Sequence, residues 1–246
     1  MATMTDETSE DRISAVEQEE FLRFSLVFRI QHIFLFVSVV VLIITGLPLK
    51  YHDTAWAEAF FSAIGGVMVS GLIHRIAAAI LIGVGVFHMY YILLMREGRK
   101  HLKEMLPRFK DVTDVIRNVF YFFGFIKDRP QFRRFSYIEK FDYWAVYWGM
   151  VIMIGTGLML WFKNQTMALI PKVILDAAKE AHSDEALLAT LAIVIWHFYN
   201  VHFNPSKFPM SWTWLTGRIS KKEMMHEHPL EYEELTAEQE GKEEQS

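Results

Sequence analysis

Four long apolar segments, separated by polar ones, constrain this sequence more than any other feature. Each holds about 20 residues with few charges, enough for a helix to cross a hydrocarbon core of about 30 Å. Four such segments in a bilayer are most simply arranged as an up-and-down bundle. The sequence therefore predicts an all-α membrane protein with four transmembrane helices, over residues 26–48, 69–95, 143–162 and 186–203.

The basic residues between these segments are distributed unevenly. Of the 25 Lys and Arg residues, 12 fall between Arg96 and Lys140, in the connection between the second and third segments. The first and third connections together hold four. By the positive-inside rule the long second connection lies in the cytoplasm, and so do both termini. We therefore expect a multi-pass protein of the inner (cytoplasmic) membrane.

The flanking segments differ in character from the membrane domain, which we place at residues 25–205. Residues 1–24 form a polar, acidic tail, disordered or partner-binding, without the basic start of a signal peptide. Residues 206–246 are expected to be a cytoplasmic C-terminal tail in which His226 and His228 are solvated. In the second connection, apolar residues over 109–125 have the spacing of an amphipathic helix that lies in the membrane interface. Such a helix would either attach the connection to the membrane or act as a lid.

Histidine is abundant and cysteine is absent. With ten His and no Cys, the chain has no thiolate metal site and no covalently attached haem of the c type, so metal chemistry falls to His and carboxylate. The net charge of -4 does not favour nucleic acid binding. Ionisable residues at bilayer depth are usually functional. The candidates in or beside the apolar segments are His32, His74, His88, His182 and His197.

Their depths follow from the expected orientation. His74 and His182 lie toward the outer side, and His32, His88 and His197 toward the inner side. His74 and His88 are 14 positions apart, which puts them about 21 Å apart on one helix face. Two stacked sites are implied: His74 with His182, and His197 with either His32 or His88. Facing histidines are the usual axial ligands of haem b, while the alternative is that they are packing residues or proton relays.

Two arginines flank these candidate ligands. Arg29 precedes His32 by three positions, and Arg75 follows His74 directly. A guanidinium at the rim of a haem site can pair with the propionates. The alternative is that both side chains snorkel to the lipid headgroups.

Taken together, the histidine-bearing segments resemble a known family. RIQHIFLFVSVVVLIITGLPL, LIHRIAAAILIG, KFDYWAVYWGMVIMIGTGLMLWF and AIVIWHFYNVHFNP look like the di-haem cytochrome b subunits of membrane-bound formate dehydrogenases (gamma subunit) and nickel–iron hydrogenases, of the bacterial cytochrome b561 type. The resemblance covers about residues 25 to 235. It implies two non-covalent haems b, the inner one held by His32 and His197 and the outer one by His74 and His182.

The sequence departs from that family at two points. His182 and His197 are 15 positions apart where the family has 14, so the fourth helix starts irregularly at His182 or that residue is not the ligand. His88 has no counterpart in the formate dehydrogenase pattern. It is the alternative to His32 as inner ligand, or it serves the quinone.

The resemblance also implies a function. The chain would be the quinone-reactive subunit of a respiratory complex, linking menaquinone or ubiquinone to a periplasmic iron–sulfur or multihaem cytochrome c partner, by quinone reduction or quinol oxidation. Its quinone site would lie near the start of the third helix, at Tyr137, Glu139 and Lys140, which could instead form an interfacial belt. A non-redox membrane anchor or assembly subunit and a proton-coupled transporter using membrane histidines are the alternative functions.

Overall fold

The computed structural model describes residues 19–243, so most of the acidic N-terminal tail lies outside the described residues. The chain divides into two compact units. The first, here called the membrane unit, comprises residues 30–99 and 142–211. The second, here called the mixed unit, draws its described residues from 19–29, 100–141 and 212–243.

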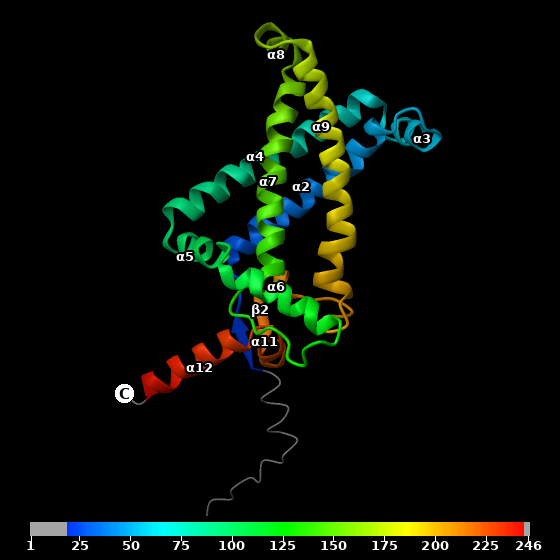
Figure 1. Cartoon of the computed structure of the whole chain (residues 1–246). Coiled ribbons are helices and arrows are strands. Elements are labelled where there is room, and N and C mark those ends of the chain that lie inside the picture. Colours follow the sequence, from blue (N-terminus) through cyan, green and yellow to red (C-terminus); the bar gives the residue numbers. More distant parts are fainter. Residues whose placement is uncertain (1–18, 244–246) are drawn as a thin grey trace, which may run out of the picture. The chain divides into compact units, whose positions relative to one another are not determined.

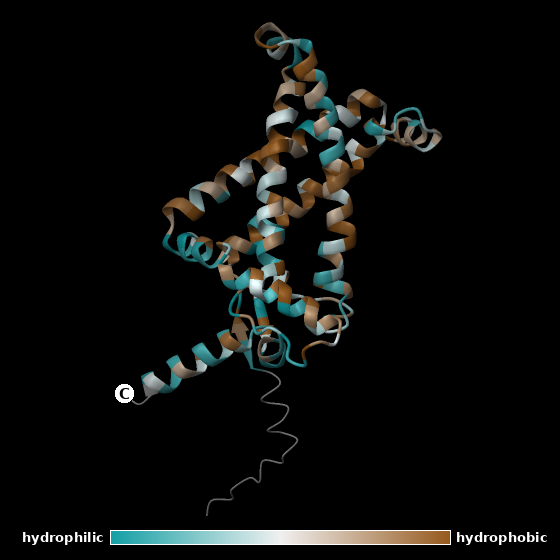
Figure 2. Ribbon diagram, viewed as in Figure 1, coloured by the Kyte–Doolittle hydropathy of each residue, from teal (hydrophilic) through white to brown (hydrophobic). Residues whose placement is uncertain are grey.

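Four helices are long and apolar enough to cross a membrane, as the sequence predicts. They are α2 (Leu26–Lys50), α4 (Val67–Leu94), α7 (Tyr137–Trp161) and a continuous 32-residue run over Lys172–Phe203. Brown, the apolar end of the scale, predominates along α2 and α4 (Figure 2). Helices suit this setting because they satisfy every backbone polar group internally. The protein is therefore an all-α membrane protein of the expected class.

The fourth helix is longer and less regular than the sequence suggests. It starts at Lys172 with α9 (Lys172–Leu191), so that His182 lies well inside a regular α-helix. It continues as two π-helical segments, η1 (Ala192–His197) and η2 (Tyr199–Phe203). Each π-type turn accommodates one residue more than an α turn. The irregularity thus lies beside His197 and not at His182.

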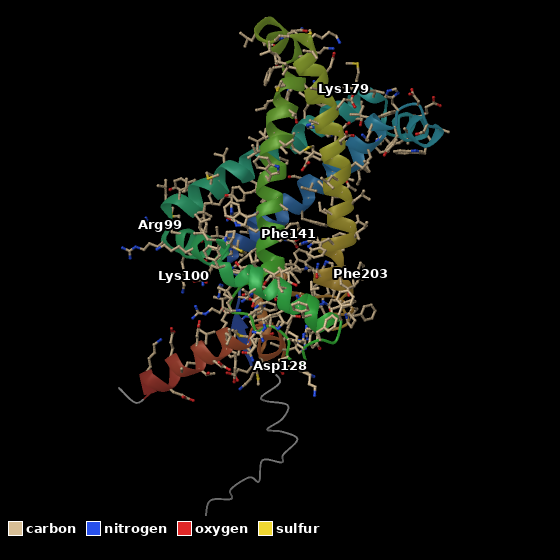
Figure 3. The ribbon with its side chains drawn as sticks, viewed as in Figure 1. Arg99, Lys100, Asp128, Phe141, Lys179 and Phe203 are labelled. Carbon is tan, nitrogen blue, oxygen red and sulfur yellow. The ribbon has the colours of Figure 1, made fainter. Side chains whose placement is uncertain are left out.

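Shorter helices complete the membrane unit. α3 (Ala55–Ile64) follows α2, and α8 (Lys163–Leu169) joins α7 to α9 (Figure 1). Gly65 and Gly66 separate α3 from α4 with φ angles of 94° and 99°, a left-handed backbone that glycine adopts without a steric penalty. The boundary between the two units falls within α5 (Arg96–Met105), which is strongly polar: its first four residues belong to the membrane unit and the rest to the mixed unit. Figure 3 shows the Arg99 and Lys100 side chains extending from this helix.

The mixed unit contains a small sheet and several helices. β1 (Glu20–Leu22) pairs antiparallel with β2 (Arg218–Ser220), with Phe21 opposite Ile219. Its helices are α6 (Phe109–Phe122), α10 (Thr213–Thr216), α11 (Lys221–Glu227) and α12 (Pro229–Glu243). The residues expected to form a C-terminal tail therefore carry a strand and three helices that belong to a packed unit.

Arg23 is the centre of a buried polar network in the mixed unit. Its guanidinium pairs with Glu231, bonds His228 Nε2 at 3.0 Å and reaches Glu139 at 3.3 Å. His228 also contacts the carbonyl of Arg133 at 2.8 Å. The expectation that His228 is solvated is wrong, because only 4% of it is exposed. Burial lowers the pKa of His228, and the neighbouring positive charge of Arg23 acts in the same direction.

Candidate functional site

His74 on α4 and His182 on α9 face each other in the membrane unit. Their ring centroids are 6.4 Å apart and the ring planes make an angle of 67°. Two imidazoles on opposite sides of one metal ion would have centroids about 6 Å apart, since each metal–nitrogen bond is about 2 Å. The structure therefore brings together the two histidines predicted for the outer site, at a separation that suits a shared iron.

Each of these histidines is bonded at Nδ1 by a threonine. Thr45 Oγ1 on α2 lies 2.9 Å from His74 Nδ1, and Thr156 Oγ1 on α7 lies 2.9 Å from His182 Nδ1. Both hydroxyls donate their own proton to the carbonyl four residues earlier, at 2.7 and 2.6 Å. A hydroxyl whose proton is so committed can only accept from the imidazole, so Nδ1 carries the proton and Nε2 the free lone pair.

A glycine follows each of these threonines and lies against the same ring. A Cβ atom on Gly46 would come within 3.3 Å of His74 Cε1, and one on Gly157 within 3.1 Å of His182 Cε1. Both distances are closer than ordinary van der Waals contact. Each Thr-Gly pair thus holds one histidine ring by a hydrogen bond on one edge and by backbone on another.

The two histidines predicted for the inner site are carried by α2 and by the fourth helix. His197, at the end of η1, bonds Asp142 Oδ2 through Nδ1 at 3.1 Å, while Trp196 donates to the other carboxylate oxygen at 2.7 Å. His32 on α2 is close enough to His197 for the two rings to interact electrostatically. A carboxylate on Nδ1 fixes the histidine tautomer and increases the basicity of Nε2.

The π-helical segment explains the spacing of 15 between His182 and His197. A wider turn absorbs one extra residue without rotating the part of the helix beyond it. His197 therefore occupies the place that a residue 14 positions after His182 would have in a regular helix, which is the spacing of His74 and His88 on α4.

His88 is placed differently from the other four histidines. Its Nδ1 lies 2.7 Å from Gln31 Oε1, and its Nε2 lies 3.2 Å from the hydroxyl of Tyr143. The rings of Tyr143 and Tyr147 flank the imidazole, with centroids 5.9 and 5.7 Å away. Both ring nitrogens are thus engaged by protein side chains, which favours His32 over His88 as the partner of His197.

These contacts occur twice, once in each half of the membrane unit. In the first half Gln31 and Thr45 on α2 bond His88 and His74 on α4. In the second half Asp142 and Thr156 on α7 bond His197 at the end of η1 and His182 on α9. Gln31 and Thr45 are 14 positions apart, and so are Asp142 and Thr156. The pair formed by α2 and α4 and the pair formed by α7 and the fourth helix thus have the same arrangement of polar contacts.

Sequence reasoning missed these partners, although a signal was present. The tripeptide Thr-Gly-Leu occurs near the end of the first apolar segment and again near the end of the third, at residues 45–47 and 156–158. The glycines look like ordinary packing residues until the contacts with the histidine rings are known. Gln31 directly precedes His32, and Asp142 stands at the edge of a segment expected to begin at residue 143.

The two arginines have protein contacts. Arg29 Nε donates to the carbonyl of Leu215 at 2.7 Å within the mixed unit. The guanidinium of Arg75 lies 5.9 Å from the centre of the Trp161 ring, a cation–π contact within the membrane unit. Arg75 is thus held beside His74, while Arg29 ties the start of α2 to α10.

The three candidate quinone residues lie in the first turn of α7 and are engaged in the mixed unit. Tyr137 accepts a hydrogen bond from Asn118 at 2.7 Å, and Lys140 contacts both carboxylate oxygens of Asp111 at 2.9 Å. Glu139 accepts from the backbone N–H of Ser136 at 2.8 Å, which caps the helix, and reaches Arg23. These contacts favour a structural role for all three.

A protein-family model covers the part of the chain that carries these histidines. The family model described as prokaryotic cytochrome b561 matches residues 23–207, which include both pairs and all four spans. The chain belongs to the prokaryotic cytochrome b561 family. No curated protein matches the chain. Membership identifies this cytochrome b561 as a membrane protein that binds haem b and takes part in haem-based electron transfer.

The residues of this cytochrome b561 fit that cofactor. A b-type haem needs paired neutral imidazoles and no covalent attachment, and His74 and His182 provide such a pair. In the described part of the chain, no cluster of three or more His, Cys, Asp or Glu residues could hold a metal ion.

Proposed function

We propose that this cytochrome b561 is the di-haem, quinone-reactive electron-transfer subunit of a respiratory complex. It would exchange electrons with a periplasmic iron–sulfur or multihaem cytochrome c subunit on one side and with menaquinone or ubiquinone on the other. Haem b supplies one-electron redox chemistry when bound. The observation that carries this proposal is the facing pair His74 and His182, with Nδ1 of each ring held by a hydroxyl.

The axial ligands proposed for the outer haem are His74 and His182, and those for the inner haem are His32 and His197. The Thr hydroxyls and the Asp142 carboxylate support this assignment, because each leaves Nε2 of its histidine available. His88 is assigned no iron, since Gln31 and Tyr143 contact its two nitrogens. Arg75, held over Trp161 next to His74, is placed to pair with a propionate of the outer haem.

We infer that both termini and the connection between α4 and α7 face the cytoplasm. Eleven Lys and Arg residues in that connection, with Lys140 in the first turn of α7, support this orientation. The mixed unit would then be cytoplasmic, with α6 presenting apolar side chains to the membrane interface: Phe109 and Phe122 are 95% and 83% exposed. Tyr137, Glu139 and Lys140 would fix the start of α7 on the side where the quinone reacts.

A spectroscopic titration of the purified protein tests the proposal. The pyridine haemochrome should give two haems b per chain, and a redox titration should resolve two midpoint potentials. Adding a short-chain menaquinol or ubiquinol should reduce the protein, and replacing His197 by Leu should remove one haem. A chain with fewer than two haems, or one that quinols of both types leave oxidised, would contradict it.

A further inference from the structure

The repeated Thr-Gly pairs suggest a role beyond that of the iron ligands. Thr45 and Thr156 belong to different helices and to different halves of the chain, yet each bonds Nδ1 of one of the two facing histidines at 2.9 Å. The hydroxyl proton of each is committed to a carbonyl of its own helix, Val41 in one case and Ile152 in the other. Each oxygen is therefore a fixed acceptor aimed at the imidazole N–H.

A fixed acceptor has two effects on a histidine that ligates a metal. It selects the tautomer in which Nε2 is unprotonated, and it pulls the Nδ1 proton away from the ring, which makes Nε2 a stronger electron donor. A stronger donor stabilises ferric over ferrous iron and so lowers the midpoint potential. Because the two threonines bond the two histidines that would hold one haem, their effects on its potential should add.

The surroundings of the hydroxyls strengthen this effect. Thr45 is only 3% exposed, so water does not compete for its hydroxyl. Gly46 and Gly157 leave no room for the rings to move toward the backbone, because added Cβ atoms would lie 3.3 and 3.1 Å from Cε1 of His74 and His182. The ring orientation is thus defined by both a hydrogen bond and a steric wall.

From these contacts we propose that Thr45 and Thr156 are positioning residues that set the tautomer of His74 and His182 and jointly lower the midpoint potential of the outer haem. The inference rests on the proposed function, in which these histidines ligate that haem. Neither threonine touches the iron. Each acts through the histidine that it bonds.

The test is a redox titration of Thr45→Val, Thr156→Val and the double variant, with haem content measured in parallel. Valine keeps the shape of threonine and removes the acceptor. Each single variant should raise the midpoint potential of the outer haem by up to about 59 mV. For one electron, this corresponds to a tenfold change in the ratio of reduced to oxidised haem. The double variant should raise this potential by the sum of the two single shifts. The midpoint potential of the inner haem should stay unchanged.

Two further variants serve as controls. Thr190→Val removes a hydroxyl on α9 that contacts only the carbonyl of Ala186, at 2.7 Å, and should leave both potentials as they are. Thr45→Ser keeps the acceptor and should restore the wild-type potential and the low-temperature EPR signal of the outer ferric haem. If Thr45→Val loses that haem, retention of it by Thr45→Ser supports the proposal, and loss from both variants contradicts it.

The outcomes separate this inference from the proposed function. Two haems with an unmoved outer potential in the valine variants would overturn the role of the threonines and leave the proposed function intact. A shift of the inner haem instead of the outer one would also overturn it. A wild-type chain without an outer haem held by His74 and His182 would defeat the proposed function itself.

Discussion

Asp142 Oδ2 lies 3.1 Å from His197 Nδ1, which gives the proposed inner haem ligand a carboxylate partner. The proposed ligands of the outer haem, His74 and His182, are bonded by hydroxyls. A carboxylate withdraws the Nδ1 proton more strongly than a hydroxyl does and places a negative charge beside the ring. The two proposed haem sites therefore differ in the electronic character of their ligands.

We expect Asp142→Asn to raise the midpoint potential of the inner haem by about 60 mV, the equivalent of about 1.4 kcal/mol for a single electron. The physical reason is the loss of a charged acceptor, which weakens His197 as a donor to ferric iron. A potentiometric titration followed at the Soret band measures this shift. Asp176→Asn removes a carboxylate that is bonded only to Lys172 on α9 and should leave both potentials unchanged. An inner potential that stays constant in Asp142→Asn would argue against the assignment of His197.

Haem content should distinguish His32 from His88. His32→Leu is expected to reduce the pyridine haemochrome value from two haems per chain to one, because it removes a ligand of the inner iron. His88→Leu should keep both haems, because the ring bonds Gln31 and Tyr143 instead. His52→Leu, at an exposed histidine paired with Asp53, is the control for the loss of a histidine as such. The reverse result, with one haem in His88→Leu and two in His32→Leu, would exchange the two roles.

Arg23→Met should destabilise the mixed unit by about 1.5 to 3 kcal/mol, since it removes a buried charged donor and leaves Glu231 paired with Arg134 alone. The absence of native cysteine permits a clean measurement. A single cysteine in place of Met224, which is 2% exposed, reports opening of the unit by its rate of reaction with a maleimide. Arg133→Met breaks a pair whose side chains are 53% and 49% exposed, and should cost less than about 1 kcal/mol. Equal labelling rates in the two variants would refute the importance of the buried network.

Acid should weaken the mixed unit through His228. Burial and the neighbouring Arg23 hold its pKa below the ordinary value of 6.5, so the unfolded chain binds more protons than the folded one in mildly acidic solution. The contribution to stability is complete above pH 6.5 and decreases as the pH falls below that value. Pulse proteolysis with thermolysin across a urea series, at several pH values, measures the free energy of unfolding. His228→Gln should show a smaller dependence on pH in this range, and an unchanged slope would assign the effect to other groups.

Labelling of single cysteines tests the orientation. Lys163→Cys, at the start of α8, should react in intact cells with a maleimide that does not cross the inner membrane. Lys127→Cys, in the connection between α6 and α7, should react only after permeabilisation. Both positions are exposed, and the cysteine-free parent gives the background. The opposite pattern would reverse the proposed topology.

Much of the membrane unit follows from the sequence, because each span must be apolar over its whole length and because ionisable residues stand out against that background. The fold class and the family are confirmed. The pairing of His74 with His182 follows from depth alone, and the structure brings these rings together. Their roles as haem ligands stay predictions.

Other features of the structure could not be predicted from the sequence. The mixed unit was missed because its strands have three residues each and its core includes Arg23, His228 and Glu231, residue types that normally remain in water. The extra residue before His197 is visible as a spacing of 15, but only the backbone shows that a π-helical segment absorbs it. The partners of the histidine Nδ1 atoms come from other helices, so no local pattern around a histidine reveals them.

The pairing of β1 with β2 has a consequence for biosynthesis. The ion pair between Glu19 and Lys221 joins residues 202 positions apart, and the strands beside it span nearly the same interval. At a synthesis rate of about 5 to 20 residues per second, the first strand waits for roughly 10 to 40 seconds before its partner leaves the ribosome. By then all four spans have been translated, so closure of the sheet is a late event that follows synthesis of the whole membrane unit.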